Sequence, residues 1–120
     1  MADTIETTAR ITAADTGGVE RLNIYKAGTY TVTTTLAGER SHTTATATTD
    51  EQLSLGDVGT GKFLYLTSDK AITVKIGGSD TARALALAAG KFLLMWVDVT
   101  SVYVSNASGA TATIEYWVAG

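Results

Sequence analysis

The chain has 120 residues, a length that suits one domain and leaves little apolar area beyond a single core. It contains no cysteine, which excludes disulfide bonds and thiolate chemistry, and no proline, so its turns must depend on the 12 glycines and on Asn, Asp and Ser. The net charge of -3, with Lys and Arg scattered along the chain, excludes the basic patch that a nucleic-acid partner requires.

The N-terminal segment, residues 1–12, is polar and rich in threonine, and it carries Asp3 and Glu6 without an apolar run. This composition excludes a secretory signal. The longest strongly apolar stretch, residues 92–97, is too short to cross a bilayer. We therefore expect a protein made in a cytoplasm without export and without a membrane partner. Residues 1–12 are expected to form a separate segment or extended arm, and residues 13–120 the folded domain.

Threonine occurs 22 times, and its β-branched side chain and hydroxyl suit the solvated face of a strand. Apolar residues alternate with polar ones over several stretches, and this period of two is typical of half-buried strands. In residues 111–118, for example, Ile114, Tyr116 and Val118 fall on one face. The strands predicted in this way are residues 5–13, 19–26, 29–36, 43–49, 63–68, 71–76, 91–97, 102–105 and 111–118.

Glycine and small polar residues separate these strands. The turns that we expect are Gly17-Gly18, Ala27-Gly28, Gly38, Ser68-Asp69, Gly77-Gly78, Ala89-Gly90 and Asn106 to Gly109. Short strands with turns at regular intervals predict an all-β fold. We expect an antiparallel β-sandwich, jelly-roll-like, of about eight strands in a single domain.

Three segments leave alternatives open. Residues 79–89 could form a short helix capped by Ser79 and ended by Gly90, but their alternation favours a strand. Residues 41–49, almost wholly Thr and Ala, could be a loop, an edge strand or an arm that pairs with a neighbouring chain. Residues 91–97 are apolar on both faces. They are either a central strand covered within the chain or a strand with one face buried by another subunit.

Three motifs resemble chemical sites. Residues 56–62 match the start of a phosphate-binding loop, but Phe63 stands where the motif needs Ser or Thr, so we interpret them as a turn between strands. His42 is the only histidine and is expected at the surface without catalytic or metal partners. Asn106-Ala107-Ser108 fits the glycosylation triplet and is interpreted as a turn. We therefore expect no enzyme, no cofactor and no metal site.

The aromatic residues include five tyrosines and two tryptophans. Core and interface packing is the favoured interpretation, because Tyr and Trp bury a large area while keeping a polar tip in water. The alternative is an exposed aromatic face that stacks on the sugar rings of a glycan.

The second half of the chain reads FLYLTSDKAITVKIGG and then RALALAAGKFLLMWVDVTSVYVSNASGATATIEYWVAG. This arrangement resembles small bacteriophage virion structural proteins of the capsid decoration (cement) type. The residues that carry the resemblance are Ser68, Asp69, Ile72, Val74, Ile76, Gly77, Gly90, Leu93, Leu94, Val102, Val104, Asn106, Ser108, Gly109, Ala112, Ile114, Ala119 and Gly120.

The resemblance implies a protein of the capsid surface, made in the host cytoplasm, that binds and stabilises the lattice of a major capsid protein. Its expected partners are the major capsid protein and copies of itself in a trimer. The alternative function is a tail, baseplate or head-fibre β module that binds a host-surface glycan. The candidate contact residues are Ile5, Ile11, Thr44, Thr46, Phe92, Trp96, Tyr103 and Trp117.

Overall fold

The computed structural model describes residues 3–14, 16–18, 20–32 and 40–120. Its strands pair antiparallel throughout, and one short 3-10 turn, Thr81–Arg83, is the only helical element in these ranges. No helix in the described part of the chain is long and apolar enough to cross a membrane. The chain divides into two compact units, residues 1–33 and 34–120. The predicted all-β, antiparallel fold is confirmed.

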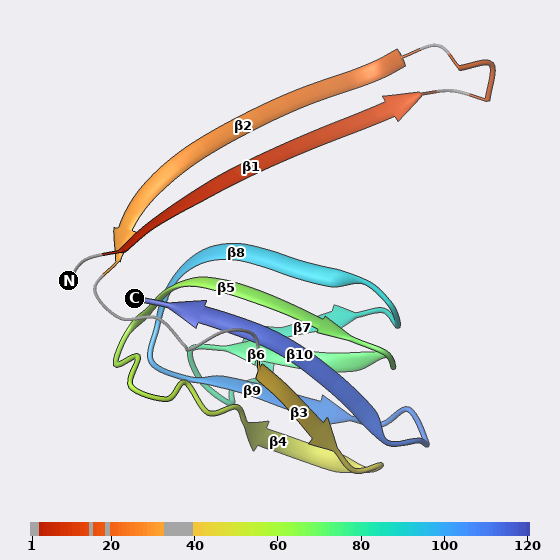
Figure 1. The fold of residues 1–120 in the computed structure, drawn as a ribbon. Coiled ribbons are helices and arrows are strands. Elements are labelled where there is room, and N and C mark those ends of the chain that lie inside the picture. The colour runs from red at the N-terminus through yellow and green to blue at the C-terminus, as the bar shows by residue number, and fades with distance from the viewer. Residues whose placement is uncertain (1–2, 15, 19, 33–39) are drawn as a thin grey trace. The chain divides into compact units, whose positions relative to one another are not determined.

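The first unit is a two-stranded ribbon of β1 (Asp3–Ala14) and β2 (Glu20–Val32) (Figure 1). The turn predicted at Ala27-Gly28 is wrong, because Gly28 lies inside β2 opposite Thr7. The Thr7 Oγ1 donates to the Gly28 carbonyl over 3.4 Å, and the pairing continues on both sides of it. The predicted division after residue 12 would cut β1 from its partner, whereas the two units divide after residue 33.

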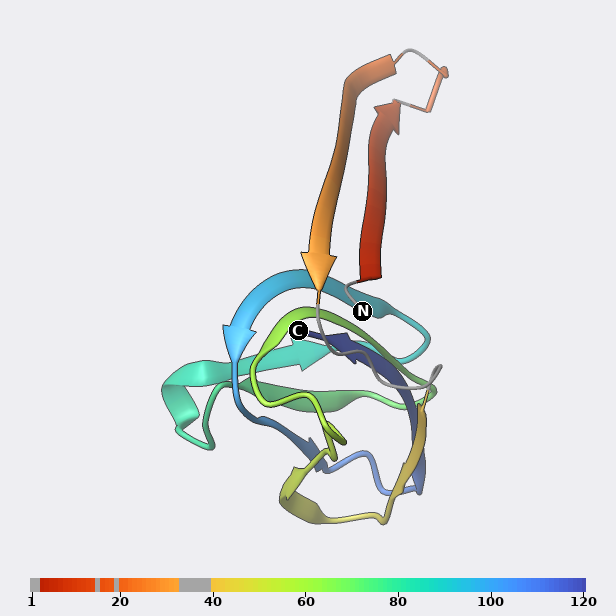
Figure 2. The same cartoon turned by 60° about the vertical axis from the view of Figure 1, so that its left-hand side comes forward.

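The second unit is a sandwich of two four-stranded sheets (Figures 1 and 2). Sheet I has the order β3-β10-β5-β8, and sheet II has the order β4-β9-β6-β7. Their bounds are β3 Arg40–Thr44, β4 Thr48–Gln52, β5 Gly61–Ser68, β6 Ile72–Ile76, β7 Ala84–Leu87, β8 Phe92–Val99, β9 Val102–Asn106 and β10 Ala112–Ala119.

The strand pairing follows one rule: β3 lies beside β10, β4 beside β9, β5 beside β8 and β6 beside β7. The chain from β3 to β10 is therefore arranged as one long hairpin rolled into two sheets, which is the topology of a jelly roll. The sandwich has eight strands and the ribbon adds two. Of the stretches predicted as strands, 5–13, 19–26 and 29–36 fall in the ribbon within the described residues, and 43–49 covers parts of both β3 and β4.

The core lies between the sheets and is built by alternation. Along β10, Ala112, Ile114, Tyr116 and Val118 are buried, whereas the residues between them are more exposed. Inward residues of β5, β6 and β9 complete the core in the same way, because successive side chains of a strand point to opposite faces. The side chains in it that are fully or almost fully buried include Leu53, Leu64, Leu66, Val74, Val102, Val104, Ile114 and Val118.

Asn106 joins two turns at one end of the sandwich. Its side chain is fully buried, and its Nδ2 donates to the carbonyls of Thr44 at 3.3 Å, Ala45 at 3.2 Å and Ala110 at 2.8 Å. Its Oδ1 accepts from the backbone N and the Oγ of Ser108. The turn predicted here is confirmed. The hydrogen bonds of the Asn106 amide link the β3–β4 turn to the β9–β10 turn.

The three ambiguous segments are now resolved within the described residues. A strand at 79–89 is confirmed only for residues 84–87, after the 3-10 turn. Residues 41–49 contribute to two edge strands, β3 and β4, and the turn between them. Residues 92–97 belong to β8, which is an edge strand, so their interpretation as a central strand is wrong. The strand end predicted at 33–36 and the turn at Gly38 lie outside the described residues.

Candidate association surfaces

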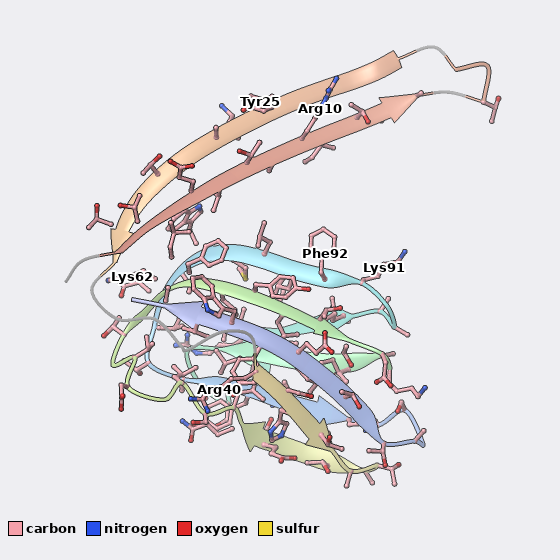
Figure 3. All side chains as sticks on the ribbon, viewed as in Figure 1. Arg10, Tyr25, Arg40, Lys62, Lys91 and Phe92 are labelled. Carbon is pink, nitrogen blue, oxygen red and sulfur yellow. The ribbon has the colours of Figure 1, made fainter. Side chains whose placement is uncertain are left out.

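The outer face of sheet I carries a row of exposed apolar side chains. On β8, Phe92 is 68% exposed, Leu94 is 46% exposed and Trp96 is 46% exposed. Their neighbours on β5 are Thr67, Tyr65 and Phe63 respectively, because directly opposite residues of an antiparallel pair share a face. Figure 3 shows the Phe92 ring standing on β8. The structure therefore places the candidates Phe92 and Trp96 on one surface.

Three aromatic rings form a cluster on this face. Phe63 is only 6% exposed although it is absent from the main core cluster. Its ring meets Trp96 edge-to-face at a centroid distance of 5.1 Å and Trp117 at 5.9 Å. The candidate Trp117, half-buried on β10, thus lies on the same face as Trp96. Edge-to-face pairs of this kind contribute about 0.5–1.5 kcal/mol beyond the area they bury.

Charged residues border the apolar row at both ends of β8. Lys62 at the start of β5 forms an ion pair with Asp98, with 2.6 Å between Nζ and Oδ1. Lys91 directly precedes Phe92 at the other end of the strand (Figure 3). Because the Asp98 side chain is largely exposed and that of Lys62 partly so, their ion pair adds little stability, but it places both charges at that end of the strand.

The ribbon has two unlike register faces. On β1, one face combines Ile5 and Ile11 with Thr7 and Ala9, and Lys26 of β2 lies opposite Ala9. The other face combines Thr4, Glu6, Thr8, Arg10 and Thr12 with positions such as Tyr25, which lies opposite Arg10 (Figure 3). Ile11 is 57% exposed, and Ile5 is half-buried. The candidates Ile5 and Ile11 therefore share one face, and it is the more apolar one.

Thr44 is not available as a contact residue. It is fully buried, and its Oγ1 donates to the Glu51 Oε2 over 2.9 Å. Its position at the end of β3, opposite Ala112, points it into the core, where the hydroxyl needs the carboxylate as a partner. Thr46 is exposed in the turn between β3 and β4, so this candidate remains accessible.

His42 is half-buried rather than a plain surface histidine. Its Nε2 lies 2.8 Å from the Glu51 Oε1, so that β3 of sheet I contacts β4 of sheet II through these two side chains. The two side chains are in close contact without a well-aligned hydrogen bond. Among the described residues, no group of three or more His, Asp or Glu side chains could hold a metal ion.

Tyr103 lies on a different surface from Trp96. It is half-buried on β9 of sheet II, opposite Lys75 of β6 and Gln52 of β4, whereas Trp96 belongs to sheet I. These two candidate contact residues therefore lie on different sheets. The sequence pattern could not show this, because it does not order the strands.

The outer face of sheet II carries a partly buried ion pair. The Lys75 Nζ lies 2.7 Å from the Asp50 Oδ1 and donates to the Ser79 carbonyl over 3.0 Å. The Ser105 Oγ donates to the same Asp50 oxygen and accepts from the Asp50 backbone N. The hydrogen bond from Lys75 holds the pKa of the Asp50 carboxyl below its ordinary value of 3.8, against the opposing effect of burial.

The glycine-rich stretch at residues 56–62 is a loop that leads into a strand. Gly56 has a φ of 59°, and β5 begins at Gly61. No helix follows the stretch, so the predicted turn between strands is confirmed. A phosphate-binding loop requires a helix whose N-terminus faces the phosphate.

Sequence reasoning missed Phe63 and the Lys75–Asp50 pair as elements of the outer faces. The alternation in β5 could have placed Phe63 on the same face as Tyr65 and Thr67. No local signal links Lys75 to Asp50, which precedes it by 25 residues.

Comparisons of the chain with protein-family models, with curated proteins and with solved structures find no match. The surfaces described above are therefore the basis of the functional argument.

Proposed function

We propose that this chain is a structural protein of a bacteriophage virion, a capsid decoration (cement) protein that binds the lattice of a major capsid protein. Three features support the proposal: the resemblance carried by the second half of the chain, the jelly-roll topology, which is common among capsid proteins, and the β1–β2 ribbon. The ribbon is the observation that carries it.

A two-stranded ribbon is at best marginally stable in water by itself. The strands of this ribbon have 12 and 13 residues, and the core cluster of buried residues contains no described residue from it. Residues 8–14 and 25–29 are exposed throughout. An element of this length gains stability by docking on a partner, and the face of Ile5 and Ile11 is its apolar side. We assign this face to the contact with the major capsid protein.

The test uses particles of the source phage assembled without this chain. The purified full-length chain should bind them at a saturating, lattice-defined ratio and raise the temperature at which the particles come apart. The double variant Ile5→Thr/Ile11→Thr should lose most of this binding, because it removes apolar area from the docking face while keeping good strand formers.

The matched control is Tyr25→Thr. Tyr25 is 62% exposed on the other face of the same ribbon, so its loss should leave capsid binding unchanged. If the wild-type chain does not bind these particles, the proposal is refuted. If the Ile5→Thr/Ile11→Thr variant binds the particles as well as wild type does, the ribbon is not the contact with the capsid.

The glycan-binding alternative is favoured by one observation, the exposed Trp96 beside Phe63 and Trp117. An exposed indole ring offers a flat apolar face on which the C–H face of a sugar ring can pack. Binding to a glycan array that is lost in Trp96→Ala would support a tail or baseplate module and count against the capsid assignment.

A further inference from the structure

The sandwich has four edge strands, and three of them carry features that prevent pairing with another chain. β3 is five residues long and polar, beginning with Arg40. β4 is polar and irregular, with a register shift between Thr48 and Glu51 and a φ of 50° at Asp50. β7 has only four residues. Short, charged or bulged edges are the usual protections of a monomeric sheet.

The fourth edge, β8, lacks these protections between Phe92 and Trp96. It has eight residues, FLLMWVDV, with one charge, Asp98, near its end. Its register with β5 is regular from Phe92 to Trp96, and the shift in that pair lies beyond Trp96, towards Val99. Within the part of the chain that the structure describes, no strand pairs with its outer edge. A long apolar edge of this kind is a template for another strand.

The inward side of β8 is also incompletely covered. Leu93, Met95 and Val97 face the core side, yet all three remain half-buried rather than buried. A strand added at this edge would place side chains beside the inward residues of β8 on one face of the sheet and beside its outward residues on the other. The partner must therefore present apolar residues on both of its faces, and β8 itself is such a strand.

The sequence of β8 fits an antiparallel pair with itself. If Leu94 lies opposite Leu94 of a second copy, Phe92 lies opposite the second copy's Trp96, and Leu93 lies opposite its Met95. A Phe–Trp pair already exists across β5 and β8, where Phe63 lies opposite Trp96. The same pairing would repeat twice across the twofold axis.

The charges select the antiparallel direction. Lys91 precedes β8 and Asp98 lies near its end. In an antiparallel pair centred on Leu94, Lys91 of each copy lies opposite Val97 of the other, one residue from its Asp98, so opposite charges meet at each end, whereas a parallel pair in register brings like charges together at both ends.

We propose that the outer edge of β8 binds β8 of a second copy in a twofold, antiparallel pair centred on Leu94. Sheet I of the two copies then forms one continuous sheet, with Phe92, Leu94 and Trp96 of the two copies side by side on its outer face. This stoichiometry differs from the trimer that the resemblance implies. The inference does not depend on capsid binding, since the pair forms in the isolated protein.

The first test is the mass of the purified full-length chain by light scattering over a range of concentrations. Wild type should have twice the mass of one chain at high concentration, and Leu94→Thr should require at least tenfold more protein to dimerise. The control is Leu85→Thr, on the edge strand β7 of sheet II, where Leu85 is 42% exposed at a core-facing position opposite Val74. It should dimerise like wild type. A monomer at every concentration, or a trimer, would overturn the proposal.

The second test measures the register. The chain has no cysteine, so a single introduced thiol reports on one position. Opposite residues have Cα atoms roughly 4.5–5.5 Å apart, within the range of a disulfide. Leu94→Cys should therefore form a disulfide-linked dimer on mild oxidation. Phe92→Cys, which faces Trp96 of the other copy, and Leu85→Cys should not. Equal cross-linking by all three would show unspecific contact and contradict the twofold pair.

Discussion

The two sheets of the sandwich bury the same core but present different outer faces to solvent. Sheet II shows Lys75 paired with Asp50, the hydroxyl of Ser105, and the small residues Ala84 and Ala86 on β7. Sheet I shows Phe92, Leu94 and Trp96 on β8. The fold requires only the inner face of each sheet, because that face closes the core. The β8 pairing proposed above gives the apolar face of sheet I a role outside the fold, whereas Lys75 and Asp50 of sheet II pair within one chain.

The largest expected effect compares an inner with an outer leucine of sheet I. Leu66 on β5 is fully buried, and Leu66→Ala should lower the free energy of unfolding by about 3 kcal/mol. Leu94→Ala, measured on dilute protein, should lower it by about 0.5 kcal/mol or less. Urea denaturation of both variants gives the values. A similar loss in both would mean that the outer face belongs to the folding core.

The next largest effect is expected at Asn106, whose side chain links the β3–β4 turn to the β9–β10 turn. Asn106→Ala removes donors to three carbonyls and leaves buried polar groups without partners. We expect a loss of about 2 kcal/mol in unfolding free energy, measured by denaturation. A loss below roughly 0.5 kcal/mol would show that water replaces the amide without cost.

A smaller effect is expected at Tyr116 on β10. Its hydroxyl donates to the Ser54 carbonyl over 2.6 Å, and burial raises the pKa of this side chain. Tyr116→Phe keeps the ring in the core and should cost about 1 kcal/mol. Thermal unfolding measures it. An unchanged midpoint would show that the hydrogen bond is not needed to hold the segment after β4 against sheet I.

The smallest effect is the acid sensitivity of sheet II. Because the folded-state pKa of Asp50 lies below its ordinary value of 3.8, its stabilisation is complete above that value and is lost as the pH falls below about 4. Asp50→Asn should therefore make the acid limb of the stability curve shallower. Lys75→Met should do the same, because it removes the partner that lowers the pKa. An acid limb identical to that of wild type in both variants would contradict this role.

The regular parts of the sandwich could be predicted from the sequence because their alternation is local. The pattern of Ile114, Tyr116 and Val118 identifies the inner face of β10 without knowledge of its neighbours. The turn at Asn106 was also predictable, since it uses residues that cap their own backbone.

The remaining features depend on which strands become neighbours. Thr44 resembles an accessible threonine in sequence, but the pairing of β3 with β10 buries it beside Glu51. Gly28 resembles a turn residue, but pairing with β1 keeps it in a strand. The edge position of β8 follows from the order of sheet I, which no local pattern contains.

The most direct test of the difference between the two sheets is amide hydrogen exchange at two protein concentrations. Exchange within residues 92–97 of β8 should slow markedly in the concentrated sample, while exchange in β3, β4 and β7 stays the same. Exchange in residues 92–97 that is independent of concentration, or slowing that is equal at all four edges, would contradict the assignment of β8 as the association edge.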